Sequence, residues 1–294
     1  MREKFLQFFR RKVELRIFSG LSFSLVWFLL FLIVPIAVIF LYSFWRQEYI
    51  SIIPQFTIDN YAQFLANPIH IPLFLRSLGI SAAVTMGSIG LAYPAAYFLA
   101  FRVRKYKIPL LLALMAPFWT SYLLIVYAWK IILGYDGILN SLLLNLRLVE
   151  QPVDLLLYSP FAVIITLIHI WSPWLVLPLY ASLEKMDKSL LEAAMDLGAT
   201  PTQAFLRVTL PLTWPALIVA VLFVFVPTVG EFVTPALVGG PQGYMYGNLI
   251  ENYFHLGFNW PLGSSLAFVM LALVMVMTLL LLRTVGPDKV MESL

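Results

Sequence analysis

The sequence has 294 residues, of which 61% are apolar and only 12% are charged, and its formal net charge is +4. A soluble globular domain carries about 25% charged residues, so this composition argues against a soluble enzyme. Stretches of about 20 mostly apolar residues recur, each long enough to cross a hydrocarbon core about 30 Å thick. The sequence therefore predicts an all-α integral membrane protein, and its lack of cysteine excludes disulfides and thiolate metal sites.

Six transmembrane helices are predicted, at 21–44, 73–101, 108–133, 158–182, 212–236 and 264–283. The first is too long for the core of a signal peptide, so it is expected to be retained. The second could be shorter, because Gly87, Gly90 and Pro94 interrupt it. The connections at 45–72 and 134–157 are longer than simple turns and could hold short helices or re-entrant segments.

Basic residues are concentrated on one side of these spans. They precede the first span and occupy the second-to-third connection, the fourth-to-fifth connection and the C-terminal tail. These 15 of the 19 basic residues are Arg2, Lys4, Arg10, Arg11, Lys12, Arg16, Arg102, Arg104, Lys105, Lys107, Lys185, Lys188, Arg207, Arg283 and Lys289. Only Arg46, Arg76, Lys130 and Arg147 fall on the other side. Because basic connections stay in the cytoplasm, the N-terminal segment 1–20 and the tail 284–294 are both predicted to be cytoplasmic.

The connection at 187–211 contains clear signals for two helices joined by a corner. Asp187 can cap the first helix, and Lys188 can pair with Glu192 one turn later. The apolar residues Leu190, Leu191, Ala194 and Leu197 are expected on one face of that helix. Gly198 stands where a helix ends in a left-handed residue, and Thr200-Pro201-Thr202-Gln203 forms a capping box for the second helix. The residues alone leave two interpretations, an amphipathic hairpin on the membrane surface or a rigid cytoplasmic element that docks into another protein.

The same connection carries a family resemblance. Glu192-Ala193-Ala194, Gly198 and Val208-Thr209-Leu210-Pro211 match the EAA motif, E-A-A-x3-G-x9-I-x-L-P, with Val208 in place of Ile. The chain thus resembles the permeases of bacterial binding-protein-dependent ABC importers, which have the type I (MetI-like) fold. Resemblance to the spermidine/putrescine subfamily is carried by Phe118-Trp119-Thr120-Ser121, Tyr127-Ala128-Trp129, Gly137-Ile138-Leu139-Asn140, Pro178-Leu179-Tyr180 and Gly230-Glu231-Phe232-Val233. Ile125 departs from that subfamily, in which an Arg often stands at this position.

The resemblance implies an extra first span and a five-helix permease core over 73–283. It implies a bacterial inner-membrane importer of polyamines, with a second permease subunit, a cytoplasmic ABC ATPase dimer and a periplasmic substrate-binding protein as partners. The EAA loop at 187–211 would couple the permease to the ATPase through Glu192, Ala193, Ala194, Asp196, Gly198, Leu210 and Pro211. ATP and Mg would be bound by the ATPase, since no G-x-x-x-x-G-K-[ST] motif occurs here. This chain itself is expected to hold no catalytic site, cofactor or metal and to bind no nucleic acid.

Glu231 is the most unusual single residue, because it is a carboxylate within the fifth predicted span. A carboxylate at mid-membrane costs roughly 2.5–3.5 kcal/mol, so Glu231 is expected to face protein or water. The flanking Pro227, Gly230 and Pro235 would break the helix and open carbonyls, which is tolerable only beside a cavity. Two interpretations stay open: Glu231 lines the translocation path and attracts a cationic substrate, or it has a structural partner, either Lys130 or a backbone amide.

Four aromatic residues lie close together on the third predicted span, namely Trp119, Tyr122, Tyr127 and Trp129. They could form a cation–π surface for amines, or they could belong to the aromatic belt of any membrane interface. The first interpretation adds Trp119, Tyr122 and Tyr127 to the substrate path of Glu231. His169 is expected to be a buried, hydrogen-bonded imidazole. Gly79, Ala83 and Gly87 repeat every four residues, which favours close helix packing.

Two alternative functions remain at this point. A permease of the same type could carry another small solute, such as ferric iron or a phosphonate. An ion-coupled secondary transporter belongs to a different class and would work without an ATPase. That class needs charged groups within several spans, whereas Glu231 is nearly alone.

Overall fold

The computed structural model describes Ser22 and residues 24–49 and 51–285. The predicted N-terminal segment 1–20, and the tail from residue 286 onward, lie outside the described residues. The chain forms two compact units, Met1–Ala66 with Tyr253–Val269, and Asn67–Asn252 with Met270–Leu294. Each unit is described by itself below, and the larger second unit contains the residues of the candidate site.

The first unit contains a span-length helix, a small hairpin and a short helix. Its elements are the π turn η1 (Leu29–Ile33), α2 (Val34–Tyr42), the antiparallel strands β1 (Arg46–Glu48) and β2 (Ser51–Ile53), and α3 (Asp59–Ala66). Asn60 is buried and its Nδ2 donates to the carbonyls of Ser43 and Trp45, both at 2.9 Å, which fixes α3 to the end of α2. The 45–72 connection therefore contains the expected short helix and a hairpin that the sequence analysis did not predict.

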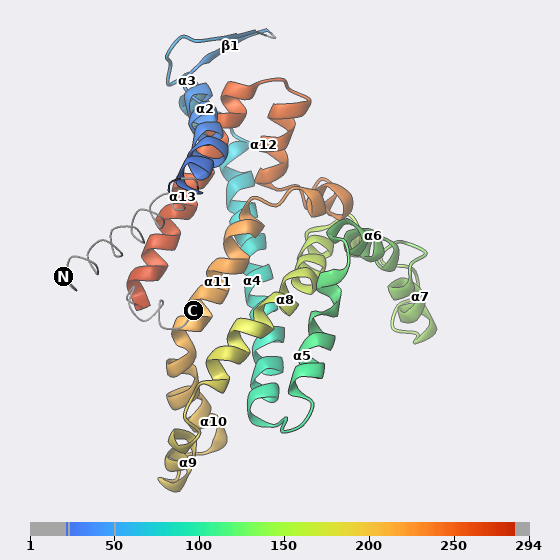
Figure 1. Ribbon diagram of the computed structural model, residues 1–294. Helices are drawn as coiled ribbons and strands as arrows, with labels where there is room; N and C mark the ends of the chain where they lie inside the picture. Colours follow the sequence, from blue (N-terminus) through green and yellow to red (C-terminus); the bar gives the residue numbers. More distant parts are fainter. Residues whose placement is uncertain (1–21, 23, 50, 286–294) are drawn as a thin grey trace, which may run out of the picture. The chain divides into compact units, whose positions relative to one another are not determined.

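The second unit is built on three long helices (Figure 1). They are α4 (His70–Phe101), α8 (Pro160–Glu184) and a helix that is continuous over Pro201–Val229. The continuous helix consists of α10 (Pro201–Ala204), the π turn η4 (Phe205–Thr209) and α11 (Leu210–Val229). α4 packs mainly against α8 and secondly against α11. Its buried core includes Val84, Ala96, Val163, Leu167, Leu175, Leu179 and Val224.

Shorter elements connect these helices. They are α5 (Lys107–Met115), the 3-10 turn η2 (Ala116–Trp119), α6 (Tyr122–Ile132), α7 (Ile138–Asn145), the 3-10 turn η3 (Asp154–Leu156), α9 (Ser189–Asp196) and the π turn η5 (Pro235–Gly239). The two remaining helices, α12 (Tyr246–His255) and α13 (Trp260–Val285), contribute residues to both units.

The third predicted span is not one helix. Residues 108–133 form α5, η2 and α6. Pro117 lies in η2, and the two residues after η2 leave the helical region, with ψ 143° at Thr120 and 131° at Ser121. Within the described residues, five helices have the length and apolarity to span a membrane, namely Ser24–Tyr42, His70–Phe101, Pro160–Glu184, Pro201–Val229 and Trp260–Arg283. The third of the six predicted spans is therefore corrected from one helix to a broken segment. In the described part of the chain a long apolar helix is present at each of the other five spans, and the helix at the fifth span ends at Val229.

The second predicted span continues through the residues that were expected to interrupt it. α4 is helical across Gly87, Gly90 and Pro94. A Cβ at Gly87 would lie 2.3 Å from Cδ1 of Ile168 on α8, so the glycine allows the two helices to approach closely. Gly79 has no atom within 4 Å of such a Cβ. The predicted close packing is therefore present at Gly87 and absent at Gly79.

One end of the second unit gathers the basic connections. Figure 1 shows α9 and α10 at the same end as the turn between α4 and α5. Lys107 Nζ donates to both carboxylate oxygens of Glu184, at 2.7 and 2.9 Å, and thereby joins the start of α5 to the end of α8. The hydrogen bond to Glu184 raises the pKa of Lys107. The second-to-third and fourth-to-fifth connections, which were predicted to share one side of the membrane, therefore lie at the same end of this unit.

Candidate functional site

The predicted corner between two short helices is present at 187–204. Asp187 Oδ1 accepts from the Ser189 N–H at 2.9 Å, and this hydrogen bond lowers the pKa of Asp187. Gly198 ends the first helix in the left-handed region, with φ 88°. Thr200 Oγ1 accepts from the Gln203 N–H at 3.3 Å, while Gln203 Oε1 accepts from the Thr200 N–H at 3.0 Å. The capping box thus starts a helix that is continuous from Pro201 to Val229 and includes the predicted start of the fifth span at residue 212.

Most of the EAA residues are accessible in this chain. Glu192, Ala193, Asp196, Gly198 and Pro211 are exposed, whereas Ala194 and Leu210 are half-buried. The expected apolar face is only partly covered, since Leu191 is half-buried but Leu190 and Leu197 are 46% and 90% exposed.

The expected Lys188–Glu192 ion pair is not formed among the described residues. Lys188 Nζ lies 5.9 Å from the centre of the Phe101 ring, at the end of α4. The side chain therefore contacts the membrane-spanning part of the chain, and the Glu192 carboxylate stays exposed.

Glu231 lies at a break in the fifth span. The long helix ends at Val229, and helical structure resumes at Val233 and runs through η5. Glu231 Oε1 accepts from the N–H groups of Val233 and Thr234, at 2.9 and 3.2 Å, and so caps the new helical segment. Of the structural partners considered for Glu231, the backbone amide is present. Lys130 instead lies over the ring of Tyr158, at 5.7 Å.

Two residues of α12 contact the same break in the fifth span. Asn248 Nδ2 donates to the Phe232 carbonyl at 2.6 Å, and its Oδ1 accepts from the Met245 N–H at 3.1 Å. A Cβ at Gly247 would lie 2.6 Å from the carbonyl oxygens of both Gly230 and Glu231. Sequence reasoning missed both residues, because nothing in the Gly247-Asn248 pair signals contact with a segment 16 residues earlier.

The break in the third span meets the break in the fifth. Tyr122, at the start of α6, shares a hydrogen bond with the Thr234 hydroxyl, and its own hydroxyl also interacts with the Glu231 carboxylate. Two of the predicted path residues, Tyr122 and Glu231, are therefore brought together.

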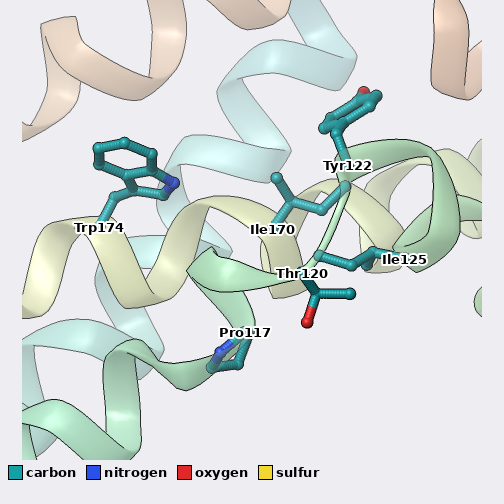
Figure 2. A pocket seen from close by; sticks show the side chains of 6 residues that line it. All are labelled: Pro117, Thr120, Tyr122, Ile125, Ile170 and Trp174. Carbon is teal, nitrogen blue, oxygen red and sulfur yellow. The ribbon is translucent and has the colours of Figure 1, made fainter.

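A pocket of ≈ 190 Å³ opens beside Tyr122, between the broken third span and α8 (Figure 2). It is lined by Pro117, Thr120, Tyr122, Ile125, Ile170 and Trp174. The pocket lining therefore includes the rings of Tyr122 and Trp174 and the hydroxyl-bearing side chains of Thr120 and Tyr122. Ile125 contributes an apolar wall where the resemblance would have placed an Arg.

The four aromatic residues of the third span do not form one surface. Trp119 is 70% exposed and Tyr127 is 45% exposed, so both face away from the core of this chain. Trp129 Nε1 donates to His169 Nδ1 at 2.9 Å, which gives His169 the hydrogen bond that was expected for it. Only Tyr122 contacts the break at Glu231.

The two interruptions bring together groups of several chemical kinds. Interrupted helices present unpaired backbone groups and half-helix ends toward a binding site. Here a carboxylate, hydroxyl groups and aromatic rings lie near two such interruptions, and these groups can attract a positively charged solute.

Comparison with known proteins gives consistent matches over most of the chain. Residues 15–286 match the family model described as "Binding-protein-dependent transport system inner membrane component". The spermidine/putrescine transport system permease protein PotB of Escherichia coli strain K12 is 39% identical over 257 residues, which are 87% of this chain and 92% of that protein. PotB of Haemophilus influenzae is 36% identical, over 87% of this chain and 88% of its own.

A solved structure shares the fold. It is the bacterial alginate ABC transporter in complex with an alginate pentasaccharide-bound periplasmic protein, which has a TM-score of 0.76 and 17% identity. The similarity covers 95% of this chain and 96% of the matched chain.

Replacing Gly247 with Ala is expected to destabilise the break in the fifth span. The new methyl group would meet two backbone carbonyl oxygens that have no side-chain freedom to move, at a cost of about 1–3 kcal/mol. The apparent Tm of the purified protein should fall. Gly79→Ala is the control, because that site is open and Ala favours a helix by about 0.5–1 kcal/mol. Equal Tm values for the two variants would contradict the tight contact.

Proposed function

The chain belongs to the family of binding-protein-dependent transport system inner membrane components, and on that premise we propose that it forms the translocation path for polyamines such as spermidine and putrescine. It is a permease subunit of an ABC importer in the inner membrane and not an enzyme. The observation that carries the substrate assignment is the 36–39% identity, over 87% of the chain, to permeases named for spermidine/putrescine transport.

The site supports a cationic solute by its charge and its surroundings. Glu231 supplies a carboxylate in a segment where the bilayer offers no competing solvent, so attraction to an ammonium group is stronger than in water. Tyr122, which interacts with Glu231, and Trp174 supply ring faces to the neighbouring pocket, and such faces attract ammonium groups. A chain of methylene groups with charged ends would match the mixture of apolar and polar lining.

The partners follow from the permease assignment. A second permease subunit would complete the path, a periplasmic binding protein would deliver the polyamine, and a cytoplasmic ATPase dimer would bind ATP and Mg. Both termini of this chain would lie in the cytoplasm, on the side of the basic connections. Alternating access requires that the ATPase states differ in their affinity for this chain.

The coupling loop is proposed as the contact with the ATPase. Glu192 and Asp196 are exposed carboxylates on α9, and Leu197 is an exposed apolar side chain at the corner. Ala193, Ala194 and Gly198 allow close approach, while Leu210 and Pro211 begin α11, the part of the long helix that follows the π turn. Glu192 is the residue proposed to meet a basic ATPase side chain.

The decisive experiment reconstitutes this chain with its permease partner, ATPase and binding protein in liposomes. Spermidine or putrescine should stimulate ATP hydrolysis and accumulate in the vesicles. Ferric iron and phosphonates serve as the comparison solutes. Stimulation by one of those and by neither polyamine would overturn the substrate assignment, and uptake without the ATPase would overturn the ABC mechanism.

Glu231→Gln should lower polyamine uptake about tenfold, equivalent to about 1.4 kcal/mol. The Gln oxygen can still accept from Val233 and Thr234, so the cap is retained and only the charge is lost. Glu231→Ala removes the cap as well and should also lower the apparent Tm, by a loss of about 1 kcal/mol. Unchanged uptake by the Gln variant at all polyamine concentrations would show that the carboxylate has a structural role alone.

Gly198→Ala should weaken binding of the ATPase to the permease. A residue with a Cβ pays about 1–2 kcal/mol in the left-handed region, so the corner would change its shape. Co-purification of the ATPase and transport-linked ATP hydrolysis should both fall. Gly79→Ala, in an ordinary helical conformation, provides the matched control, and equal ATPase binding by both variants would contradict this role of the corner.

A further inference from the structure

The junction between the coupling loop and the membrane helix is a π turn. Within η4, the Leu210 N–H donates to the Phe205 carbonyl, which is one residue further back than in an α-helix. Pro211 follows directly and has no N–H to give to the carbonyl of Arg207. π turns and prolines are the usual positions at which a helix bends. Motion of α9 and α10 could therefore be absorbed here before it reached α11.

An aromatic contact spans this junction and reaches a different helix. The Phe205 ring, inside η4, meets the rings of Tyr93 and Tyr97 on α4. Both contacts are edge-to-face, with ring centres 5.7 Å apart and planes at 83°. The first residues of the long helix are thus held against α4, and Ala204 beside them is buried.

A buried chain of hydrogen bonds reinforces the same contact. Thr213 Oγ1 donates to the Thr209 carbonyl at 2.9 Å and lies 2.8 Å from the Tyr93 hydroxyl. Because the Thr213 hydroxyl has a single hydrogen, Tyr93 must be the donor to Thr213 in this arrangement. The three residues are at most 7% exposed, and hydrogen bonds in series strengthen one another at such sites.

Open space lies next to this contact. A groove of ≈ 420 Å³ adjoins Tyr93 and Phe205, and its lining also includes Gly90, Pro94 and Trp214. Packing against the two rings is therefore incomplete at the groove within this chain. The hydrogen bond between Tyr93 and Thr213 adds a directional restraint to the packing of the buried Tyr93 ring.

Resting on the coupling role proposed above, we infer that Tyr93 and Thr213 are positioning residues that transmit the motion of the coupling loop to α4. The Tyr93–Thr213–Thr209 chain and the Phe205 contact restrain the π turn. A displacement of α10 then moves α4 and α11 together instead of bending the helix at η4. Neither residue contacts the ATPase or the solute in this role.

The first test measures the number of polyamine molecules imported per ATP hydrolysed in the reconstituted complex. Tyr93→Phe and Thr213→Val each remove the inter-helix hydrogen bond and keep the shape of the side chain. Each should lower this ratio roughly 3- to 10-fold, the range expected for one lost hydrogen bond. The double variant should import no fewer polyamine molecules per ATP than either single variant. Thr213→Ser keeps the hydroxyl and should have the wild-type ratio.

Tyr97→Phe is the matched control. It also removes a tyrosine hydroxyl next to Phe205, but one for which no hydrogen bond is found among the described residues. Its ratio should equal that of the wild type. A wild-type ratio in Tyr93→Phe, or an equal loss in Tyr97→Phe, would overturn the inference. Apparent Tm values measured alongside identify variants that fail to fold.

A second readout does not depend on the transported solute. Because the chain has no cysteine, spin labels can be attached at Thr202→Cys on α10 and Phe98→Cys on α4, both exposed positions. In the assembled complex the distance between the labels should stay constant with and without ATP, and should become ATP-dependent in Tyr93→Phe. An ATP-dependent distance in the wild type would overturn the inference. Failure of polyamines to stimulate wild-type ATP hydrolysis would overturn the proposed substrate and leave this distance test decisive.

Discussion

A bilayer provides no water for the backbone groups of an interrupted helix, and every break in a spanning segment must therefore be satisfied from within the protein. Side chains supply several of these hydrogen bonds at the break at 230–232. The Glu231 carboxylate accepts from two amides and Asn248 donates to the Phe232 carbonyl, while the lack of a side chain at Gly247 lets the α12 backbone lie close to the carbonyls of Gly230 and Glu231. A carboxylate that is costly in a membrane is thereby fixed by the fold, with its charge oriented toward the second interruption at Tyr122.

The sequence predicted the class of fold and most of its helices because hydrophobic length is a local property. The exceptions have identifiable causes. The third span breaks at Thr120 and Ser121, two polar residues within a mostly apolar stretch, where the backbone leaves the helical region after the turn that contains Pro117. α4 remains helical at Gly87 because the close contact with Ile168 outweighs the low helix propensity of glycine. Amino-acid composition indicates neither the backbone angle at a residue nor the residue that it contacts on another helix.

The coupling loop was the part of the candidate site most open to prediction, since caps and left-handed glycines act over four or five residues. The capping box at Thr200 and the conformation of Gly198 are both as expected. The exposed Leu197 and the contact between Lys188 and Phe101 were not predicted, because they depend on how the loop meets the ends of the spans. Near Glu231, the position of a charged residue within an apolar span identified the carboxylate. It could not identify Asn248, because that residue is distant from the break in sequence.

The helix over Pro201–Val229 joins the two functional regions within one element of 29 residues, which at about 1.5 Å per residue extends roughly 44 Å. Its first turn belongs to the corner of the EAA loop, and its last residue precedes the segment that carries Glu231. A continuous helix passes rotation about its axis, and displacement along it, from one end to the other, apart from what the π turn absorbs. A movement of the corner would therefore reach the residue next to the Glu231 break without any intervening element.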